Sequence, residues 1–139
     1  MPSRSRRIWH PLVMATKLFP MLSCSDLPRS LEFYGGLLEG VESYRFPNEG
    51  EPAFVALTIG ESAEIGLGGI AVEPAHRRPQ RPASGHRIEL CVYVDDVDAT
   101  FAQARHAGFE GVTEPKDMPW GERVAWVADP DGNLVMLTQ

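Results

Sequence analysis

Few of the reactive side chains in this sequence have the spacing that is typical of a catalytic or metal-binding site. The two cysteines, Cys24 and Cys91, are far apart, and neither belongs to a C-x-x-C pair. They therefore indicate neither a disulfide scaffold nor a zinc site. No serine or cysteine lies in a recognisable nucleophile motif such as G-x-S-x-G. The glycine-rich run at 66–69 fits neither a dinucleotide-binding fingerprint nor a P-loop, so we interpret it as the end of a strand.

The histidines lie where exposure to solvent is the simplest explanation. His10 is in an N-terminal tail, His76 and His86 are in a proline-rich linker, and His106 is at the exposed end of a predicted helix. The remaining polar group of interest is Glu89, which stands between two hydrophobic neighbours on a predicted strand. Of the candidate functional residues it is the least core-like.

An internal repeat indicates the elements that must position these groups. The run at 22–27 recurs at 92–97, and a helical pattern follows each copy. Asp26 and Asp96 are 70 positions apart, about half the chain, and each suits the N-cap of its helix. The chain is therefore expected to contain two copies of one structural unit.

Three strand-like runs follow each helix, after a glycine that should end it (Gly40 and Gly108). These runs are 41–46, 54–59 and 63–67 in the first half, and 111–114, 123–128 and 134–138 in the second. Residues 1–16 form an N-terminal arm, and a linker at about 71–86 separates module 1 (about 17–70) from module 2 (about 87–139). The sequence predicts an α+β fold of two tandem βαβββ modules.

The first strand of the second module has two clearly different faces. Its apolar residues, which should pack on the helix, are Ile88, Leu90, Val92 and Val94. The alternate residues, which should carry any function, are Arg87, Glu89, Cys91 and Tyr93.

Composition narrows the classes of partner. The net charge of −6 makes nonspecific affinity for nucleic acid improbable on electrostatic grounds, and no apolar run approaches the length that spans a bilayer. The N-terminal stretch has arginines but no apolar core of an export signal, so a cytoplasmic location is expected.

Two further motifs resemble those of a known family. The stretch Asp26-Leu27-Pro28-Arg29-Ser30-Leu31-Glu32-Phe33-Tyr34 is similar to the one that opens the first helix in the glyoxalase/bleomycin-resistance/dioxygenase (vicinal oxygen chelate) superfamily. The stretch Asp129-Pro130-Asp131-Gly132-Asn133-Leu134 resembles the turn before its last strand. The resemblance implies two βαβββ modules whose mixed sheets curl around a cleft, which dimerisation often completes.

The resemblance also implies four positions for the ligands of a divalent metal. Enzymes of the superfamily use His, Gln or Glu there, and the corresponding residues in this chain are Phe19, Gly66, Glu89 and Met136. Only Glu89 has a donor that suits a hard cation, so we expect no metal and no other cofactor. A shifted site that uses Glu64, His86 and Glu89 is the alternative.

Apolar residues at these positions would make the cleft a roomy, aromatic-lined pocket. Trp126 matches a strand position whose aromatic residue lines the pocket in the glyoxalases that the chain resembles. Trp120 lies on a loop that could close the mouth, and Glu89 would orient a ligand. The predicted ligand-binding residues are Phe19, Met21, Glu89, Tyr93, Trp120, Trp126 and Met136.

This combination resembles the metal-free bleomycin-resistance branch, whose homodimers sequester an antibiotic. The first hypothesis is therefore a metal-independent protein that binds a small hydrophobic or aromatic molecule, acts as a homodimer and has no catalytic residue. A superfamily enzyme of lyase, isomerase or dioxygenase type with an atypical site is the second hypothesis. A carrier or sensor without a role in resistance is the third.

Overall fold

The computed structural model describes residues 17–70, 76–78, 80–81, 85–86 and 88–139. The predicted N-terminal arm, which contains His10, lies outside these residues, as does much of the predicted linker.

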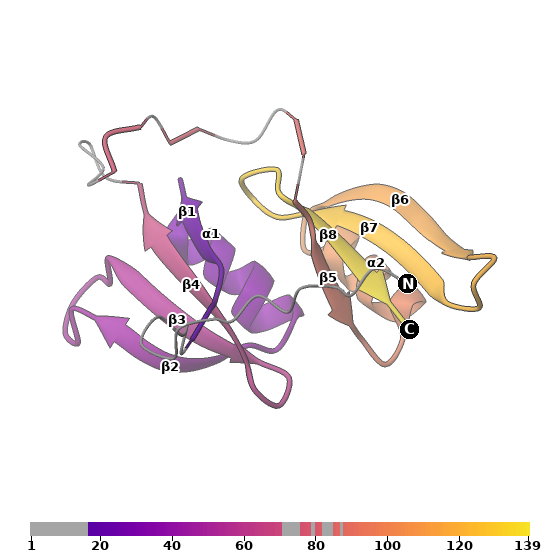
Figure 1. Cartoon of the computed structure of the whole chain (residues 1–139), viewed down its shortest axis with the longest axis horizontal. Helices are drawn as coiled ribbons and strands as arrows, with labels where there is room; N and C mark the ends of the chain where they lie inside the picture. The colour runs from indigo at the N-terminus through magenta and orange to yellow at the C-terminus, as the bar shows by residue number, and fades with distance from the viewer. Residues whose placement is uncertain (1–16, 71–75, 79, 82–84, 87) are drawn as a thin grey trace, which may run out of the picture.

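Each half of the chain folds into a four-stranded mixed sheet with one helical stretch against it (Figure 1). The first half contains β1 (Met21–Cys24), α1 (Leu27–Leu31), η2 (Glu32–Leu37), β2 (Val41–Phe46), β3 (Phe54–Ile59) and β4 (Ala63–Gly69). The second contains β5 (Leu90–Tyr93), α2 (Val97–His106), β6 (Glu110–Asp117), β7 (Arg123–Ala128) and β8 (Leu134–Thr138).

The two sheets share one topology. Their strand orders are β1-β4-β3-β2 and β5-β8-β7-β6. In each sheet the first strand of the module runs parallel to the last, and the other neighbours are antiparallel. The predicted α+β fold of two βαβββ modules is therefore confirmed.

Both helices begin at the predicted N-caps. A carboxylate oxygen of Asp26 accepts a hydrogen bond from the backbone N–H of Arg29 (3.1 Å), and Asp96 accepts one from Ala99 (3.0 Å). These bonds satisfy N–H groups that the first turn leaves without a helical partner.

The two helices end differently. Gly108 follows α2 with φ +87°, the left-handed conformation expected of a terminating glycine. After α1 the chain continues as the π-helical segment η2, and Glu39 takes the positive φ of 57°. Gly40 is needed for another reason, because a Cβ there would lie 2.6 Å from the carbonyl oxygen of Tyr34.

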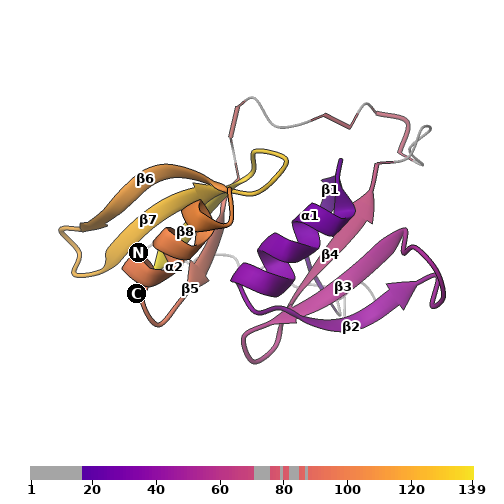
Figure 2. The ribbon, with the colours of Figure 1, turned by 180° about the vertical axis from the view of Figure 1, so that it is seen from behind.

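The helices lie on one side of both sheets and face each other (Figure 2). One continuous core fills the space between helices and sheets, and it includes Phe33, Phe101, Phe109 and Leu137. The ring of Phe33 meets the ring of Phe109 edge-on at 5.0 Å, which joins the two modules. We call the opposite side of each sheet, which faces away from the helices, its outer face.

The register of β5 agrees with the prediction except at its start. Leu90, Val92 and Val94 pack against the core, while Cys91 and Tyr93 lie on the outer face. Ile88 was expected on the inner side but is 83% exposed, because the strand begins two residues after it. Among the described residues, no helix is long and apolar enough to cross a bilayer.

Candidate ligand-binding face

Five of the seven predicted site residues belong to the outer face of the second sheet or to its margin. Trp126 pairs with Met136 across β7 and β8, and Met136 pairs with Cys91 across β8 and β5. The remaining three of these five are Glu89, just before β5, Tyr93, at the end of β5, and Trp120, in the turn between β6 and β7. Met21 begins β1 of the other sheet and Phe19 lies two residues before it, so the structure divides the predicted set.

Glu89 and Trp126 are in contact. The indole N–H of Trp126 donates to a carboxylate oxygen of Glu89 at 3.4 Å, which is a long hydrogen bond. The ammonium of Lys116 lies 5.9 Å from the centroid of the same indole ring. Trp126 is half-buried, so it presents an aromatic surface flanked by one acidic and one basic group.

A second carboxylate on this face was not predicted. Glu122 accepts hydrogen bonds from the Tyr93 hydroxyl and from the Trp120 indole N–H, both at 2.8 Å. The hydrogen bond to Glu122 raises the pKa of the Tyr93 phenol above its usual value. Glu122 lies four residues before Trp126. Side chains alternate between the two faces of a strand, so this even spacing could have placed Glu122 on the same face as Trp126.

The outer face of the first sheet is more apolar. Tyr44, Phe46 and Met21 are all more than half exposed there. The pocket was predicted to be roomy at Gly66. This prediction is wrong, because neighbouring side chains fill the space beside that residue. A Cβ at Gly66 would lie 2.7 Å from the Met21 sulfur and 2.9 Å from the Phe54 ring.

Charged groups at the margin of this first sheet are paired with each other. The Lys17 ammonium is 2.7 Å from a Glu64 carboxylate oxygen and 5.2 Å from the centroid of the Phe19 ring.

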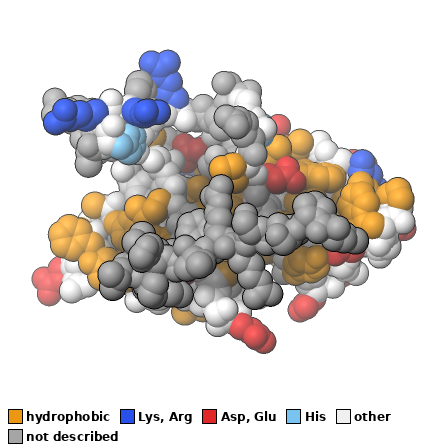
Figure 3. All heavy atoms as spheres, in the orientation of Figure 1, with side chains coloured by type: hydrophobic (Ala, Val, Ile, Leu, Met, Phe, Trp, Pro, Cys, Tyr) orange, Lys and Arg blue, Asp and Glu red, His pale blue; other side chains and the backbone are white. Residues whose placement is uncertain are grey.

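Figure 3 shows hydrophobic side chains gathered over both modules on the side that faces away from the helices.

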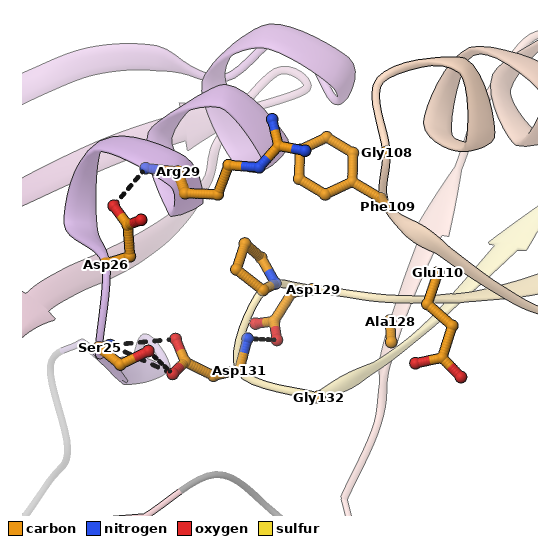
Figure 4. Close-up of a pocket in the computed structure, with 11 residues that line it drawn as sticks. Ser25, Asp26, Arg29, Gly108, Phe109, Glu110, Ala128, Asp129, Asp131 and Gly132 are labelled. Carbon is orange, nitrogen blue, oxygen red and sulfur yellow. Dashed lines mark hydrogen bonds between the residues drawn. The ribbon is translucent and has the colours of Figure 1, made fainter.

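A pocket of about 520 Å³ lies elsewhere, at the junction of the two modules (Figure 4). None of the predicted site residues lines it. Its walls come from the start of α1, the segment that follows α2 and the turn between β7 and β8, and they include Arg29, Phe109, Asp129 and Asp131.

The two stretches that carry the family resemblance contact each other at this junction. The Tyr34 hydroxyl donates to a carboxylate oxygen of Asp129 at 2.7 Å, although the two residues are 95 positions apart. Both side chains are buried. Burial, and then the Asp129 charge, raise the pKa of the Tyr34 phenol far above its usual value.

Two further polar side chains of the junction, Asp131 and Arg29, also make structural bonds. Asp131 accepts from the backbone N–H and the hydroxyl of Ser25, at 3.1 Å and 2.5 Å for the nearer oxygen. Arg29 places its guanidinium 4.1 Å from the Phe109 ring centroid and donates to the carbonyl of Ala107 at 2.5 Å. We therefore interpret the pocket as a seam between modules whose polar groups hold the fold together.

Comparison with known proteins agrees with this architecture. Residues 16–137 match the family model of the Glyoxalase/Bleomycin resistance protein/Dioxygenase superfamily. The chain belongs to this superfamily.

Two curated mycobacterial proteins align with this chain over most of its length. The uncharacterized protein Mb0911c of Mycobacterium bovis is 32% identical over 125 residues, which cover 88% of this chain and 82% of that protein. The uncharacterized protein Rv0887c of Mycobacterium tuberculosis is also 32% identical over 125 residues, covering 88% of this chain and 73% of that protein.

Solved structures with the same fold include TioX from Micromonospora sp. ML1. TioX is 26% identical with a TM-score of 0.67, and the match covers 88% of this chain and 98% of TioX. A superfamily member from Sphaerobacter thermophilus has a TM-score of 0.66 at 23% identity, covering 91% and 98% of the two chains, and it shows the fold alone.

The strand register places the four superfamily metal positions as the sequence repeat predicted. Gly66 pairs with Met21 on β1, and Met136 pairs with Cys91 on β5, so these two pairs are equivalent in the modules. Phe19 and Glu89 each precede those partners by two residues. Only one of the four positions carries an oxygen or nitrogen donor in its side chain, and this set does not fit a divalent metal.

The structure does not bring together the alternative metal site either. Glu64 is paired with Lys17, and Glu89 accepts from Trp126. In the part of the chain that the structure describes, which contains Glu64, His86 and Glu89, no three His, Cys, Asp or Glu residues are grouped closely enough to hold a metal ion.

Proposed function

We propose that this superfamily member binds a small aromatic or hydrophobic molecule without a metal, in the manner of a drug-sequestering protein. The observation that carries the proposal is the outer face of the second sheet. There Trp126 and Met136 form an apolar row, and the single carboxylate at a superfamily metal position, Glu89, accepts a hydrogen bond from Trp126. Such a surface binds by burial and stacking rather than by coordination.

A homodimer is part of the proposal. Large apolar side chains remain exposed on both outer faces, including Met21 (61%), Phe46 (60%) and Tyr93 (70%). Large exposed apolar side chains favour association with another surface. A second copy placed over these faces would also convert an open surface into an enclosed cleft.

The test is a thermal-shift screen of aromatic antibiotics, followed by titration calorimetry with a compound that raises the melting temperature. Trp126→Ala should weaken binding by roughly 30- to 1,000-fold, because it removes an aromatic anchor worth about 2–4 kcal/mol. Trp126→Phe is the matched control, since it retains a ring for stacking and removes only the N–H. It should lose far less affinity.

Metal removal completes the test. Binding should be unchanged after the protein is treated with EDTA, and elemental analysis should find no stoichiometric divalent metal. A compound whose turnover is abolished by Glu89→Gln, while its binding is retained, would show that the protein is an enzyme instead.

A further inference from the structure

Glu122 is fixed at the tip of the β6–β7 hairpin. The backbone N–H of Met118 donates to the Glu122 carbonyl at 2.8 Å, and the N–H of Gly121 donates to the Met118 carbonyl at 3.0 Å. Gly121 has φ +96°, which closes this tight turn. Because β7 begins at Arg123 and alternates, Glu122 lies on the same side as Val124 and Trp126.

The Glu122 carboxylate uses one oxygen for each of two aromatic side chains. Tyr93 donates to Oε2 and Trp120 donates to Oε1, both at 2.8 Å. Tyr93 comes from β5 and Trp120 from the hairpin turn, so the carboxylate connects the two margins of the face. Both rings remain largely exposed, at 70% and 59%, although their polar atoms are fixed.

Among the described residues, no cation forms an ion pair with either carboxylate of this face. Their hydrogen-bond donors are the uncharged groups of Trp126, Tyr93 and Trp120. In the described residues of this module, the ion pairs engage Arg123 with Asp98 and Asp117 and do not engage Glu89 or Glu122. The facing cation is Lys116, whose ammonium lies near the Trp126 ring.

We propose that the aromatic platform of Tyr93 and Trp120 selects a planar aromatic cation, and that Glu122 is the residue that positions this platform and provides its charge selectivity. This inference rests on the proposed function and names its ligand class. A flat ring system stacks on the fixed aromatic faces, while its positive charge is attracted by their π-electrons and by the Glu122 carboxylate. No ion pair of the described residues engages the Glu122 carboxylate, so its charge favours a cation over an anion.

The probes are three acridines that share one ring system: N-methylacridinium, a permanent cation; acridine, neutral at slightly alkaline pH; and acridine-9-carboxylate, an anion. Calorimetry on the full chain should show the cation bound roughly tenfold more tightly than neutral acridine, and the anion bound most weakly. Glu122→Gln should reduce the cation preference several-fold. Glu61→Gln, an exposed carboxylate in the β3–β4 turn, should leave it unchanged.

The outcomes separate the two proposals. Neutral and cationic probes that bind equally, with affinity that still depends on Trp126, would overturn the charge selectivity and leave the proposed function standing. Selectivity that is the same in Glu122→Gln as in the unmodified chain would overturn the role of Glu122. Failure of all three probes to bind would overturn the inference, while the antibiotic screen tests the proposed function separately.

A spectroscopic readout distinguishes positioning from a merely structural role of the hairpin. With tyrosine labelled at the ring carbon that bears the hydroxyl, NMR titration should show a Tyr93 pKa above the usual phenol value, as Glu122 imposes. Glu122→Gln should lower that pKa, and Tyr93→Phe identifies the signal. If the pKa of Tyr93 is the same in Glu122→Gln as in the unmodified chain, and the melting temperature is also unchanged, the hydrogen bond between Tyr93 and Glu122 is contradicted.

Discussion

Carboxylates occur in two contrasting settings in this chain. At the junction of the modules, Asp129 and Asp131 are each only 6% exposed. Their partners there are the Tyr34 hydroxyl, the Ser25 hydroxyl and backbone N–H groups. On the outer face of the second sheet, Glu89 is exposed and Glu122 is half-buried, and their partners among the described residues are aromatic side chains.

This difference teaches that the residues by which the family is recognised lie apart from the face proposed to bind a ligand. Asp129 and Tyr34 belong to the two recognisable stretches, and their bond joins one module to the other. A buried group bonded on all sides stabilises the fold but has no capacity left for a ligand. An exposed carboxylate beside fixed aromatic rings retains that capacity.

The largest test of the comparison is Asp129→Ala. Asp129 accepts from Tyr34, from the backbone N–H groups of Asp131 and Asn133, and from the Asn133 amide. Its removal should lower the free energy of unfolding by about 3–5 kcal/mol, because several buried donors lose their acceptor at about 1–3 kcal/mol each. Urea denaturation followed by circular dichroism measures the loss. Asp95→Ala, at an exposed position, should change stability by less than about 0.5 kcal/mol, and similar losses in both variants would contradict a special role for the junction.

Tyr34→Phe tests the same bond through its pH dependence. The variant should lose about 1.5–3 kcal/mol near neutral pH, the usual worth of a hydrogen bond to a charged acceptor. Because the folded-state pKa of Tyr34 is raised, this stabilisation is complete below the unfolded phenol pKa of about 10 and is lost as the pH rises through the folded value. The difference in stability between the unmodified chain and Tyr34→Phe should therefore narrow in alkali. A constant difference, or one of equal size for the exposed Tyr44→Phe, would count against the junction bond.

The smallest test compares one substitution on the two sides of the first sheet. A Cβ at Gly40 would meet the Tyr34 carbonyl oxygen at 2.6 Å, and backbone in a packed core cannot move away. Gly40→Ala should therefore cost about 1–3 kcal/mol. At Gly66 the obstacles are the ends of the Met21 and Phe54 side chains, and Met21 is exposed enough to turn aside. Gly66→Ala should lower the free energy of unfolding by less than about 1 kcal/mol. Thermal or urea unfolding measures both variants, and equal losses of stability for Gly40→Ala and Gly66→Ala would contradict the difference between the two sides of the sheet.

Much of the architecture was accessible from local patterns. Asp26 and Asp96 were predicted as N-caps, and the register of Leu90 and Val92 against Cys91 was predicted from alternation; both predictions are confirmed. The predicted start of β5, at Arg87, was wrong by three residues, since Ile88 is apolar but lies before the first ladder pair, Leu90 with Val135. Apolar character alone does not show where the pairing of strands ends.

The candidate site was accessible only in part. The predicted seven residues remain a prediction, which the structure divides between two sheets. Glu122 was not predicted because it lies just before β7, in a turn, where the sequence does not show that the alternation of strand side chains already applies. The filled space at Gly66 was also missed, because the sequence of one strand does not show which side chains of its neighbours lie over a glycine.

The sequence by itself determined the repeat, the capped helices and the strand faces, because each follows from the geometry of a few consecutive residues. Only the tertiary structure decided that Tyr34 meets Asp129, 95 positions away, and that Glu122 meets Tyr93, 29 positions away. Such contacts depend on how the sheets and helices pack, which local periodicity does not specify. The packing buries one set of carboxylates in the seam between the modules and leaves the other set less buried, beside aromatic rings.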